Sequence, residues 1–462
     1  MKYYYFLEKF SKFGFEIVSK RNEFSAVLME YGYDPAFEMA RERVLDFFSR
    51  INPKTGLIAR EHYSPKFTCK KCQSISEIGT VVRFLEWFPN DEDVVEKCEE
   101  WAQATWKYFL SKDGGLYYAV DSETGVPICL WTYTSYYGSF SLALAKLYQV
   151  TGSKEYKEKC DYLVDFVWEA RFRETDIPPS TLSCTGDFTG LWNLTFKYPR
   201  TDSPMVDTDC LYWVNKVFKL YFMLNDRKYK EIALAAANSW IKYSWKEQWK
   251  HFVVCVNGDG SEGKGPFFER IYGDGKTNCM ELVTNAYKAT RNERYLKYFD
   301  DFWSCMKRNS INDLFPGILE RGKIPSPLVG PGVDWYVETG GIDVEQSGFL
   351  DIIVKLYEVT KARRYLEEAD RYASILITKG VNKLGYHKRF WRGLGSVFLK
   401  YALVTGKVKR EELEVNKPNS VIKVFKDGKV VLCDQVGCGK VILYLGGGNY
   451  QVTLNDKVIE LN

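Results

Sequence analysis

Apolar residues recur at helical spacing in paired runs along most of the chain, and a similar short phrase joins the two runs of each pair. The phrase reads LYQVTGSKEY at 147–156, YFMLNDRKY at 221–229, YKATRNERY at 287–295 and LYEVTKARRY at 356–365. Weaker copies at 86–91 and 401–406 bring the number of copies to six. Because each phrase ends one helix-period run, turns and starts another, the pattern predicts a repeated helical hairpin.

The two helices of each predicted hairpin differ in character. The first members are more apolar and more aromatic, and they are predicted to start near Ser74, Thr132, Asp207, Asn278, Asp343 and Lys388. The second members cover about 91–110, 153–170, 226–242, 292–307 and 362–376, and a sixth at 35–48 is expected to pair with the last helix. Opposite charges lie four residues apart on them, as in Lys154 with Glu158 and Glu155 with Lys159, which is typical of a solvated face. The first members are therefore expected to form an inner layer and the second members an outer layer.

Long connections rich in glycine, proline and aromatic residues precede the inner helices, at 112–130, 171–204, 244–277 and 308–341. Six hairpins with long loops at one mouth predict a mainly α fold, an (α/α)6 toroid, over residues 1–410. This fold does not name a reaction. The site is expected where the N-termini of the inner helices and their loops converge, because helix dipoles favour anions there and loops supply carboxylates and rings.

The pattern changes after Gly406. Residues 420–462 read as short alternating strands separated by Asp-Gly, Gly-Gly-Gly and Asn-Asp turns. They predict a small antiparallel β appendage of about four strands. A segment of this size buries little apolar surface alone, so it is expected to pack on the toroid.

Aromatic residues are the strongest signal in the composition, since 13 Trp, 32 Tyr and 29 Phe make up 16% of the chain. Such a surplus must fill a large core, line a stacking surface, or do both. The formal net charge of +4 is too close to neutral to indicate nucleic acid or an anionic membrane as a partner. Neither a secretion signal nor a membrane-spanning apolar run is recognisable, so a cytoplasmic protein is expected.

The chain has 12 cysteines, and its bias toward charged residues resembles that of hyperthermophile proteins, in which intracellular disulfides occur. Disulfides or buried thiols are therefore expected. Cys69 and Cys72 have the spacing of half a zinc site, but the other candidate half, Cys433 and Cys438, is far away in sequence. No Gly-rich phosphate loop follows a strand and no paired-His motif occurs, so neither a cofactor nor a catalytic metal is expected.

Two mouths carry candidate residues in the first half of the chain. Trp131, Tyr133 and Tyr136 lie at the start of the second inner helix, where rings with a polar tip can stack on sugar faces; the alternative is that half of them fill the core. Asp207 and Asp209 open the third inner helix. They are either N-caps or carboxyls held at the mouth as general acid or base, and the two roles are not exclusive.

The fifth mouth concentrates four carboxylates and two rings within residues 334–346. Asp343 and Gln346 have the spacing of a capping box, which would make Asp343 structural. In the functional interpretation, Asp343 or Glu345 is a second catalytic carboxylate beside Asp207, because cleaving a glycosidic bond needs an acid and a base or nucleophile. The candidate substrate-binding residues here are Trp335, Tyr336 and Gln346.

At the sixth mouth, His387 lies close to Arg389, Trp391 and Arg392. The arginines could clamp a substrate carboxylate. A single histidine is more often a hydrogen-bonded scaffold residue than a catalyst, so both interpretations of His387 stay open.

The second hairpin, GGLYYAVDSETGVP followed by YYGSFSLALAKLYQVTG, resembles the repeat of N-acylglucosamine 2-epimerase-type toroids. The third, MVDTDCLYW, resembles the inner-helix Asp motif of unsaturated glucuronyl hydrolases. Both families belong to the six-hairpin glycosidase-like group, and the resemblance covers about 35–410. The hydrolase resemblance implies that Asp207 protonates the substrate or activates water. The epimerase resemblance implies a pair of catalytic histidines, of which His387 matches one.

Three functions are compatible with this pattern. The first is a glycoside hydrolase acting on an oligosaccharide, with Asp207 and either Asp343 or Glu345 as the acid/base pair. The oligosaccharide is either neutral or contains a uronic acid. The second is a sugar epimerase or uronate lyase in which His387 or Tyr133 moves the proton. The third is a catalytically silent toroid that binds glycans. In each case the expected partner is a small carbohydrate.

Overall fold

The computed structural model describes residues 44–58, 60–64, 67–187, 205–325 and 339–380, together with isolated helical residues and five strands in the remaining C-terminal part. The chain divides into two compact units. The main unit comprises Val44–Cys305 and Ile318–Pro325. The terminal unit comprises Met1–Arg43, Met306–Gly317 and Ser326–Asn462. Each unit is described by itself.

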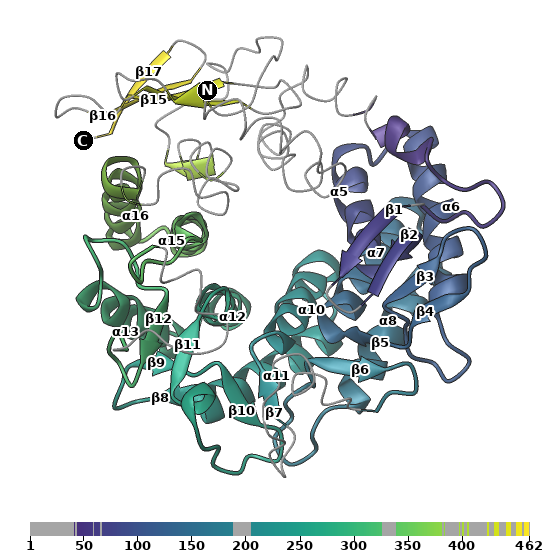
Figure 1. Ribbon diagram of the computed structural model, residues 1–462, viewed down its shortest axis with the longest axis horizontal. Coiled ribbons are helices and arrows are strands. Elements are labelled where there is room, and N and C mark those ends of the chain that lie inside the picture. Colours follow the sequence, from purple (N-terminus) through teal and green to yellow (C-terminus); the bar gives the residue numbers. More distant parts are fainter. Residues whose placement is uncertain are drawn as a thin grey trace. The chain divides into compact units, whose positions relative to one another are not determined.

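The main unit is built from helical hairpins, as the repeat predicts. Its inner helices are α5 (Thr80–Trp87), α7 (Thr134–Thr151), α10 (Cys210–Leu224) and α12 (Gly275–Thr290). The outer helices that follow them are α6 (Glu92–Phe109), α8 (Lys154–Glu169), α11 (Arg227–Ser244) and α13 (Arg294–Arg308). Consecutive inner helices pack against one another, and α8 and α11 pack on α7 and α10 (Figure 1). The predicted hairpins of this unit are therefore confirmed, with starts shifted by only a few residues.

Four of the described turns between an inner helix and its outer partner use the same backbone device, whereas Phe88, after α5, is not left-handed. The residue after the inner helix adopts a left-handed conformation, and its N–H donates to the carbonyl of a tyrosine four residues earlier. Glycine takes this conformation without strain and asparagine tolerates it, which explains the Thr-Gly and Asn-Asp steps in the repeat. The residues in question are Gly152, Asn225, Arg291 and, in the terminal unit, Lys361.

Short strands carry the long loops up to the inner helices of the main unit. A four-stranded antiparallel sheet joins β1 (Arg60–Ser64), β2 (Phe67–Ser74), β3 (Ala119–Asp121) and β4 (Pro127–Cys129), and the 3-10 helix η1 (Ile75–Gly79) leads from it into α5. The other strands form two-stranded pairs: β5 (Trp131–Tyr133) with β6 (Thr181–Ser183), β7 (Met205–Asp207) with β10 (Cys255–Asn257), β8 (Trp245–Lys246) with β9 (His251–Phe252), and β11 (Arg270–Tyr272) with β12 (Ile318–Glu320). The 3-10 helix η2 (Pro266–Phe268) precedes β11. Because β5, β7 and β11 each end within three residues of an inner helix, they fix which residues stand at its N-terminus.

The terminal unit contributes one further described hairpin, α15 (Gln346–Thr360) and α16 (Arg363–Ile375), followed by the π-helical turn η3 (Leu376–Gly380). Its C-terminal part contains five strands paired antiparallel in chain order: β13 (Lys423–Val424), β14 (Lys429–Cys433), β15 (Lys440–Tyr444), β16 (Tyr450–Leu454) and β17 (Lys457–Leu461). The domain boundaries at 410 and 420, and the packing of this segment on the toroid, stay predictions. The predicted helices at 35–48 and near Lys388 fall largely or wholly outside the described residues.

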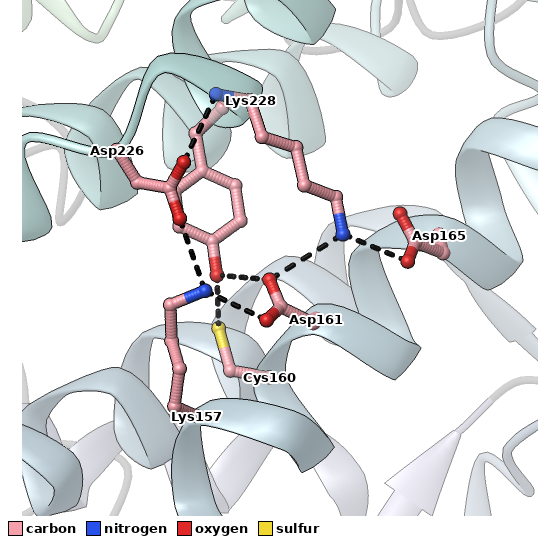
Figure 2. A network of polar contacts seen from close by, with 7 residues as sticks. Lys157, Cys160, Asp161, Asp165, Asp226 and Lys228 are labelled. Carbon is pink, nitrogen blue, oxygen red and sulfur yellow. Dashed lines mark hydrogen bonds and ion pairs between the residues drawn. The ribbon is translucent and has the colours of Figure 1, made fainter. Parts of the chain in front are cut away.

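Aromatic side chains fill much of the core of the main unit. Trp101, Trp213, Trp240 and Tyr137 are among its largest fully buried side chains. The outer helices instead carry ion pairs, including the predicted Glu155–Lys159 pair on α8, whereas Lys154 and Glu158 form no ion pair. An ion-pair network also joins α8 to α11, where Lys157 bridges Asp161 and Asp226 and Lys228 bridges Asp161 and Asp165 (Figure 2).

The cysteines for which the structure gives a state are free thiols, so the disulfide alternative is wrong for them. Eight are buried and Cys184 is half-buried. Within the described ranges, no group of three or more His, Cys, Asp or Glu side chains could hold a metal ion. Among the described helices, none is long and apolar enough to cross a membrane.

Candidate active site

The inner helices start in a common way that leaves their first side chains unused by the helix. In α7, α10, α12 and α15 the N-cap side chain accepts no hydrogen bond from the first turn. An aspartate at an N-cap ordinarily accepts from the N–H two or three residues further on. The inner helices therefore hold these side chains at the mouth without engaging them. The residues are Tyr133, Asp209, Asp274 and Glu345.

Asp207 lies buried at the end of β7, opposite Cys255 on β10. Its Oδ1 accepts the hydroxyl of Ser180 at 2.5 Å and the backbone N–H of Asp209 at 3.0 Å. Burial raises the pKa of Asp207 to about 6, a nearby Asp274 carboxylate adds to the shift, and the two hydrogen bonds oppose it. Asp207 is therefore a well-anchored carboxyl that exchanges its proton close to neutral pH.

Asp209 occupies the N-cap position of α10, but its carboxylate does not cap the helix, so that interpretation of the sequence is wrong for its side chain. No group in the described ranges hydrogen-bonds this carboxyl. Burial raises the pKa of Asp209 well above its ordinary value, and the Asp207 and Asp274 carboxylates raise it further. Asp209 is thus a half-buried carboxyl whose surroundings favour its protonated form and which has no hydrogen-bond partner among the described residues.

Asp274 completes the acid cluster from the next inner helix. It is the N-cap residue of α12, it is exposed, and it accepts a hydrogen bond from the hydroxyl of Tyr212 on α10. Sequence reasoning missed both residues. The available signal was the sequence Gly273-Asp274-Gly275, in which Asp274 stands directly before an inner helix as Asp209 does, four residues ahead of the predicted start at Asn278.

Four aromatic rings form a continuous cluster beside the acids. Tyr118 stacks on Trp131 with 5.6 Å between ring centroids, and Tyr136 lies 5.7 Å from both Tyr118 and Tyr133. All four rings are half-buried. Burial raises the pKa of Tyr133, and the Asp209, Tyr118 and Asp207 charges add to that shift, so its phenol lies within electrostatic range of the acids. The structure therefore brings Trp131, Tyr133 and Tyr136 together with Asp207 and Asp209.

The fifth mouth, in the terminal unit, repeats the backbone arrangement of the third. Asp343 is buried, and its Oδ1 accepts the N–H of Glu345 at 2.9 Å, as Asp207 accepts that of Asp209. The predicted capping box is wrong in detail, because α15 begins at Gln346 with Glu345 as N-cap. The Gln346 amide donates to the carbonyls of Phe315 and Asp343, and its oxygen accepts from Phe315 N–H and the Tyr372 hydroxyl. This engagement fits a positioning role for Gln346.

Several candidates lie outside the described residues: Trp335, Tyr336, His387, Arg389 and Trp391. His251 is described and is buried in the main unit, stacked on Trp249, with Nε2 accepting the N–H of Gly322. Burial lowers the pKa of His251 to about 4. It is therefore a neutral scaffold residue.

No model of a known protein family matches the sequence, and no curated protein resembles it in sequence. Solved structures, however, resemble the fold. Cellobiose 2-epimerase from Bacillus thermoamylovorans has a TM-score of 0.54 at 15% identity, covering 74% of this chain and 86% of that one. A D-mannose isomerase has a TM-score of 0.53 at 13% identity, covering 74% and 86%. An α-1,2-mannosidase from Trichoderma reesei has a TM-score of 0.55 at 13% identity, covering 82% and 85%.

These similarities extend over most of each chain at identities that establish fold alone. The matched proteins are named as an epimerase, an isomerase and a glycosidase, so the likeness does not distinguish these reactions. The chain is mainly helical and shares the fold of the six-hairpin glycosidase-like (α/α)6 toroids, as its sequence predicts.

Proposed function

We propose that the protein is a carbohydrate-active enzyme, and specifically a glycoside hydrolase that acts on an oligosaccharide by carboxyl acid/base catalysis. The carrying observation is Asp209, a carboxyl at the N-terminus of α10 whose pKa is raised well above its ordinary value by burial, and which caps no helix and accepts no hydrogen bond from the described residues. Departure of a sugar leaving group requires such a proton donor.

The remaining roles follow from the surroundings of Asp209. Asp274 accepts the Tyr212 hydroxyl and is exposed, which suits a role as base or nucleophile. Asp207 is anchored by Ser180 and tunes the acidity of Asp209 through their mutual repulsion. The Tyr118–Trp131 stack and its neighbours offer apolar ring faces for the sugar. The alternative in which Asp343 or Glu345 is the second catalytic carboxylate stays part of this proposal.

A second candidate is a sugar epimerase or isomerase, favoured by the fold likeness to a cellobiose 2-epimerase and a D-mannose isomerase. Its proton would move through a mouth group such as Tyr133 or through His387. The two candidates differ in their products, since a hydrolase releases new reducing ends and an epimerase only interconverts sugars. A uronate lyase would instead form an unsaturated, ultraviolet-absorbing product.

The test is a screen of oligosaccharides and unsaturated uronides, followed by reducing ends, by absorbance of the double bond and by chromatography of epimers. Wild type is compared with Asp209→Asn and Asp343→Asn, and Asp91→Asn is the control, because Asp91 caps the outer helix α6 through Val94 N–H. The hydrolase proposal expects reducing ends that Asp209→Asn abolishes and the control retains. Epimers formed without any increase in reducing ends would contradict it and support the second candidate.

A further inference from the structure

Lys216 lies on α10, and its ammonium group is held entirely by neutral acceptors on α7. Its Nζ donates to the backbone carbonyl of Ser135 at 2.7 Å and to the hydroxyl of Ser139 at 2.8 Å. Within the described chain, no carboxylate forms an ion pair with it. An ammonium group has three donors, so one N–H of Lys216 is left without a partner among these residues.

The next lysine along the helix has a carboxylate partner, so the lack of a counter-charge among the described residues is particular to Lys216. Lys219, one turn further on, is exposed and forms an ion pair with Glu281 on α12 at 3.3 Å. Lys216 is half-buried, and burial lowers its pKa to about 7, with Lys219 lowering it further and Glu281 opposing. A half-buried cation without a counter-charge is unfavourable, and an anionic ligand would supply the charge that the described residues do not.

The chain is shaped to hold the Lys216 stem against α7. A Cβ placed on Gly138 would lie 3.0 Å from Cδ and 3.1 Å from Cβ of Lys216, and 3.3 Å from the Trp213 ring. Any larger residue at position 138 would press on the lysine stem or on the buried Trp213. The glycine therefore lets the ammonium reach Ser139 and fixes its position.

Two stripes of partly accessible residues connect Lys216 with the acid cluster. On α10 they are spaced three and four residues apart, and on α7 three apart, so each stripe occupies one helix face. The stripes run beside each other, because Lys216 bonds Ser139 and the charge of Asp209 reaches Tyr133 and Tyr136. Their members are Asp209, Tyr212 and Lys216 on α10, and Tyr133, Tyr136 and Ser139 on α7.

The separation along the stripe is suited to a sugar. Asp209 and Lys216 are seven residues apart, which is about 10 Å along a helix axis. A pyranose ring with its substituents can bridge this length. A sugar held at Asp209 by the aromatic cluster would therefore direct a substituent toward Lys216.

We propose that Lys216 binds an anionic substituent of the sugar, so that the site selects an acidic sugar, a uronate or a sugar phosphate, over its neutral counterpart. This inference deepens the proposed function and rests on it, because it places the sugar at the same mouth. Lys216 acts in specificity and not in bond cleavage.

The experiment measures binding by calorimetry, without turnover, using D-glucuronate, glucose 6-phosphate and D-glucose as probes. Wild type is expected to bind at least one acidic sugar more tightly than glucose, by about 10- to 100-fold. Lys216→Met and Lys216→Gln are expected to remove this preference. Lys219→Met is the matched control, because it removes a cation from the same helix that is already paired, and it is expected to keep the preference.

Two results would overturn the inference. One is a wild type that shows no preference for either acidic sugar over glucose. The other is a preference that survives in the two Lys216 variants, each confirmed as folded by its thermal transition. The acidic probe that binds identifies the carboxylate or the phosphate as the group recognised. Lys216-dependent binding in a protein without glycosidase activity would refute only the proposed reaction, whereas cleavage of neutral sugars that is indifferent to Lys216 would refute only this inference.

Discussion

Helices α10 and α11 follow each other in the chain and both begin with an aspartate, yet the two carboxylates are used in opposite ways. In the outer helix α11, Asp226 accepts the N–H of Lys228 at 3.0 Å and forms an ion pair with Lys157 on α8 at 3.0 Å (Figure 2). In the inner helix α10, Asp209 accepts no such bond and has the carboxyls of Asp207 and Asp274 as neighbours. The same residue at the same helix position thus pairs with a lysine in one layer and, in the other, lies beside two further carboxyls without capping its helix, which is the arrangement that the proposed function uses.

The surroundings of the two aspartates show the physical origin of this difference. In the α8–α11 network, positively and negatively charged side chains alternate. Asp161 at its centre faces Lys157, Lys228 and the Tyr229 hydroxyl. Burial raises the pKa of Asp161, but these partners outweigh burial and lower it overall. Around Asp209 the neighbours are acids and phenols, and burial together with the Asp207 and Asp274 carboxylates raises its pKa.

The same Asp→Asn substitution at the two N-caps is expected to give the largest difference between the two helices. Asp209→Asn removes the proton donor, and kcat/KM on the cleaved oligosaccharide is expected to fall about 10²- to 10⁴-fold. Asp226→Asn is expected to leave kcat/KM unchanged and to lower the thermal transition, since it loses its charge pairing with Lys157. Equal losses of activity in the two variants would contradict the distinction.

The contributions of an inner-layer and an outer-layer aspartate to the free energy of unfolding are expected to change with pH in opposite directions. Asp207 has a folded pKa of about 6, raised from 3.8, so wild type loses stability as pH rises through this window and the loss is complete above it. A shift of this size corresponds to at most about 3 kcal/mol. Asp207→Asn is therefore expected to unfold later than wild type in denaturant at pH 7, and the difference is expected to vanish near pH 4. A destabilised variant at pH 7 would refute the raised pKa.

Substitution in the α8–α11 network is expected to change the free energy of unfolding least, and with the opposite dependence on pH. The folded pKa of Asp161 is lowered, so its stabilising contribution is present at neutral pH and is lost as pH falls through the folded pKa. Asp161→Asn is expected to lower the free energy of unfolding by about 1–2 kcal/mol at pH 7 and by less near pH 3. Asp165→Asn is the control, because Asp165 is more exposed and among the described residues pairs with Lys228 alone, an interaction worth less than about 1 kcal/mol.

The sequence predicted what depends on local pattern. The hairpins and turns follow from helix-period runs and from residues such as Gly152 and Asn225 that accept a left-handed backbone. Trp131, Tyr133 and Asp207 were singled out because each stands at or next to the predicted start of an inner helix.

What the sequence did not predict depends on partners far away along the chain. Asp274 gains its importance from Tyr212, which is 62 positions earlier, and Lys216 from two serines on another helix. Neither lies in a motif, and a lysine within a helix ordinarily indicates a solvated face. The capping interpretation of Asp209 was wrong because a preference for N-caps says nothing about whether the side chain turns toward the helix or away from it.

The protonation of Asp209 is the central claim, and a titration of the aspartate carboxyls tests it most directly. Carboxyl ¹³C signals from aspartate-labelled protein would be followed with pH in wild type and in Asp209→Asn, with Asp226→Asn used to assign a network carboxyl. The account predicts a carboxyl that titrates well above the ordinary aspartate value of about 3.9 and is missing only in Asp209→Asn. A signal assigned to Asp209 that titrates at or below that value would contradict the account.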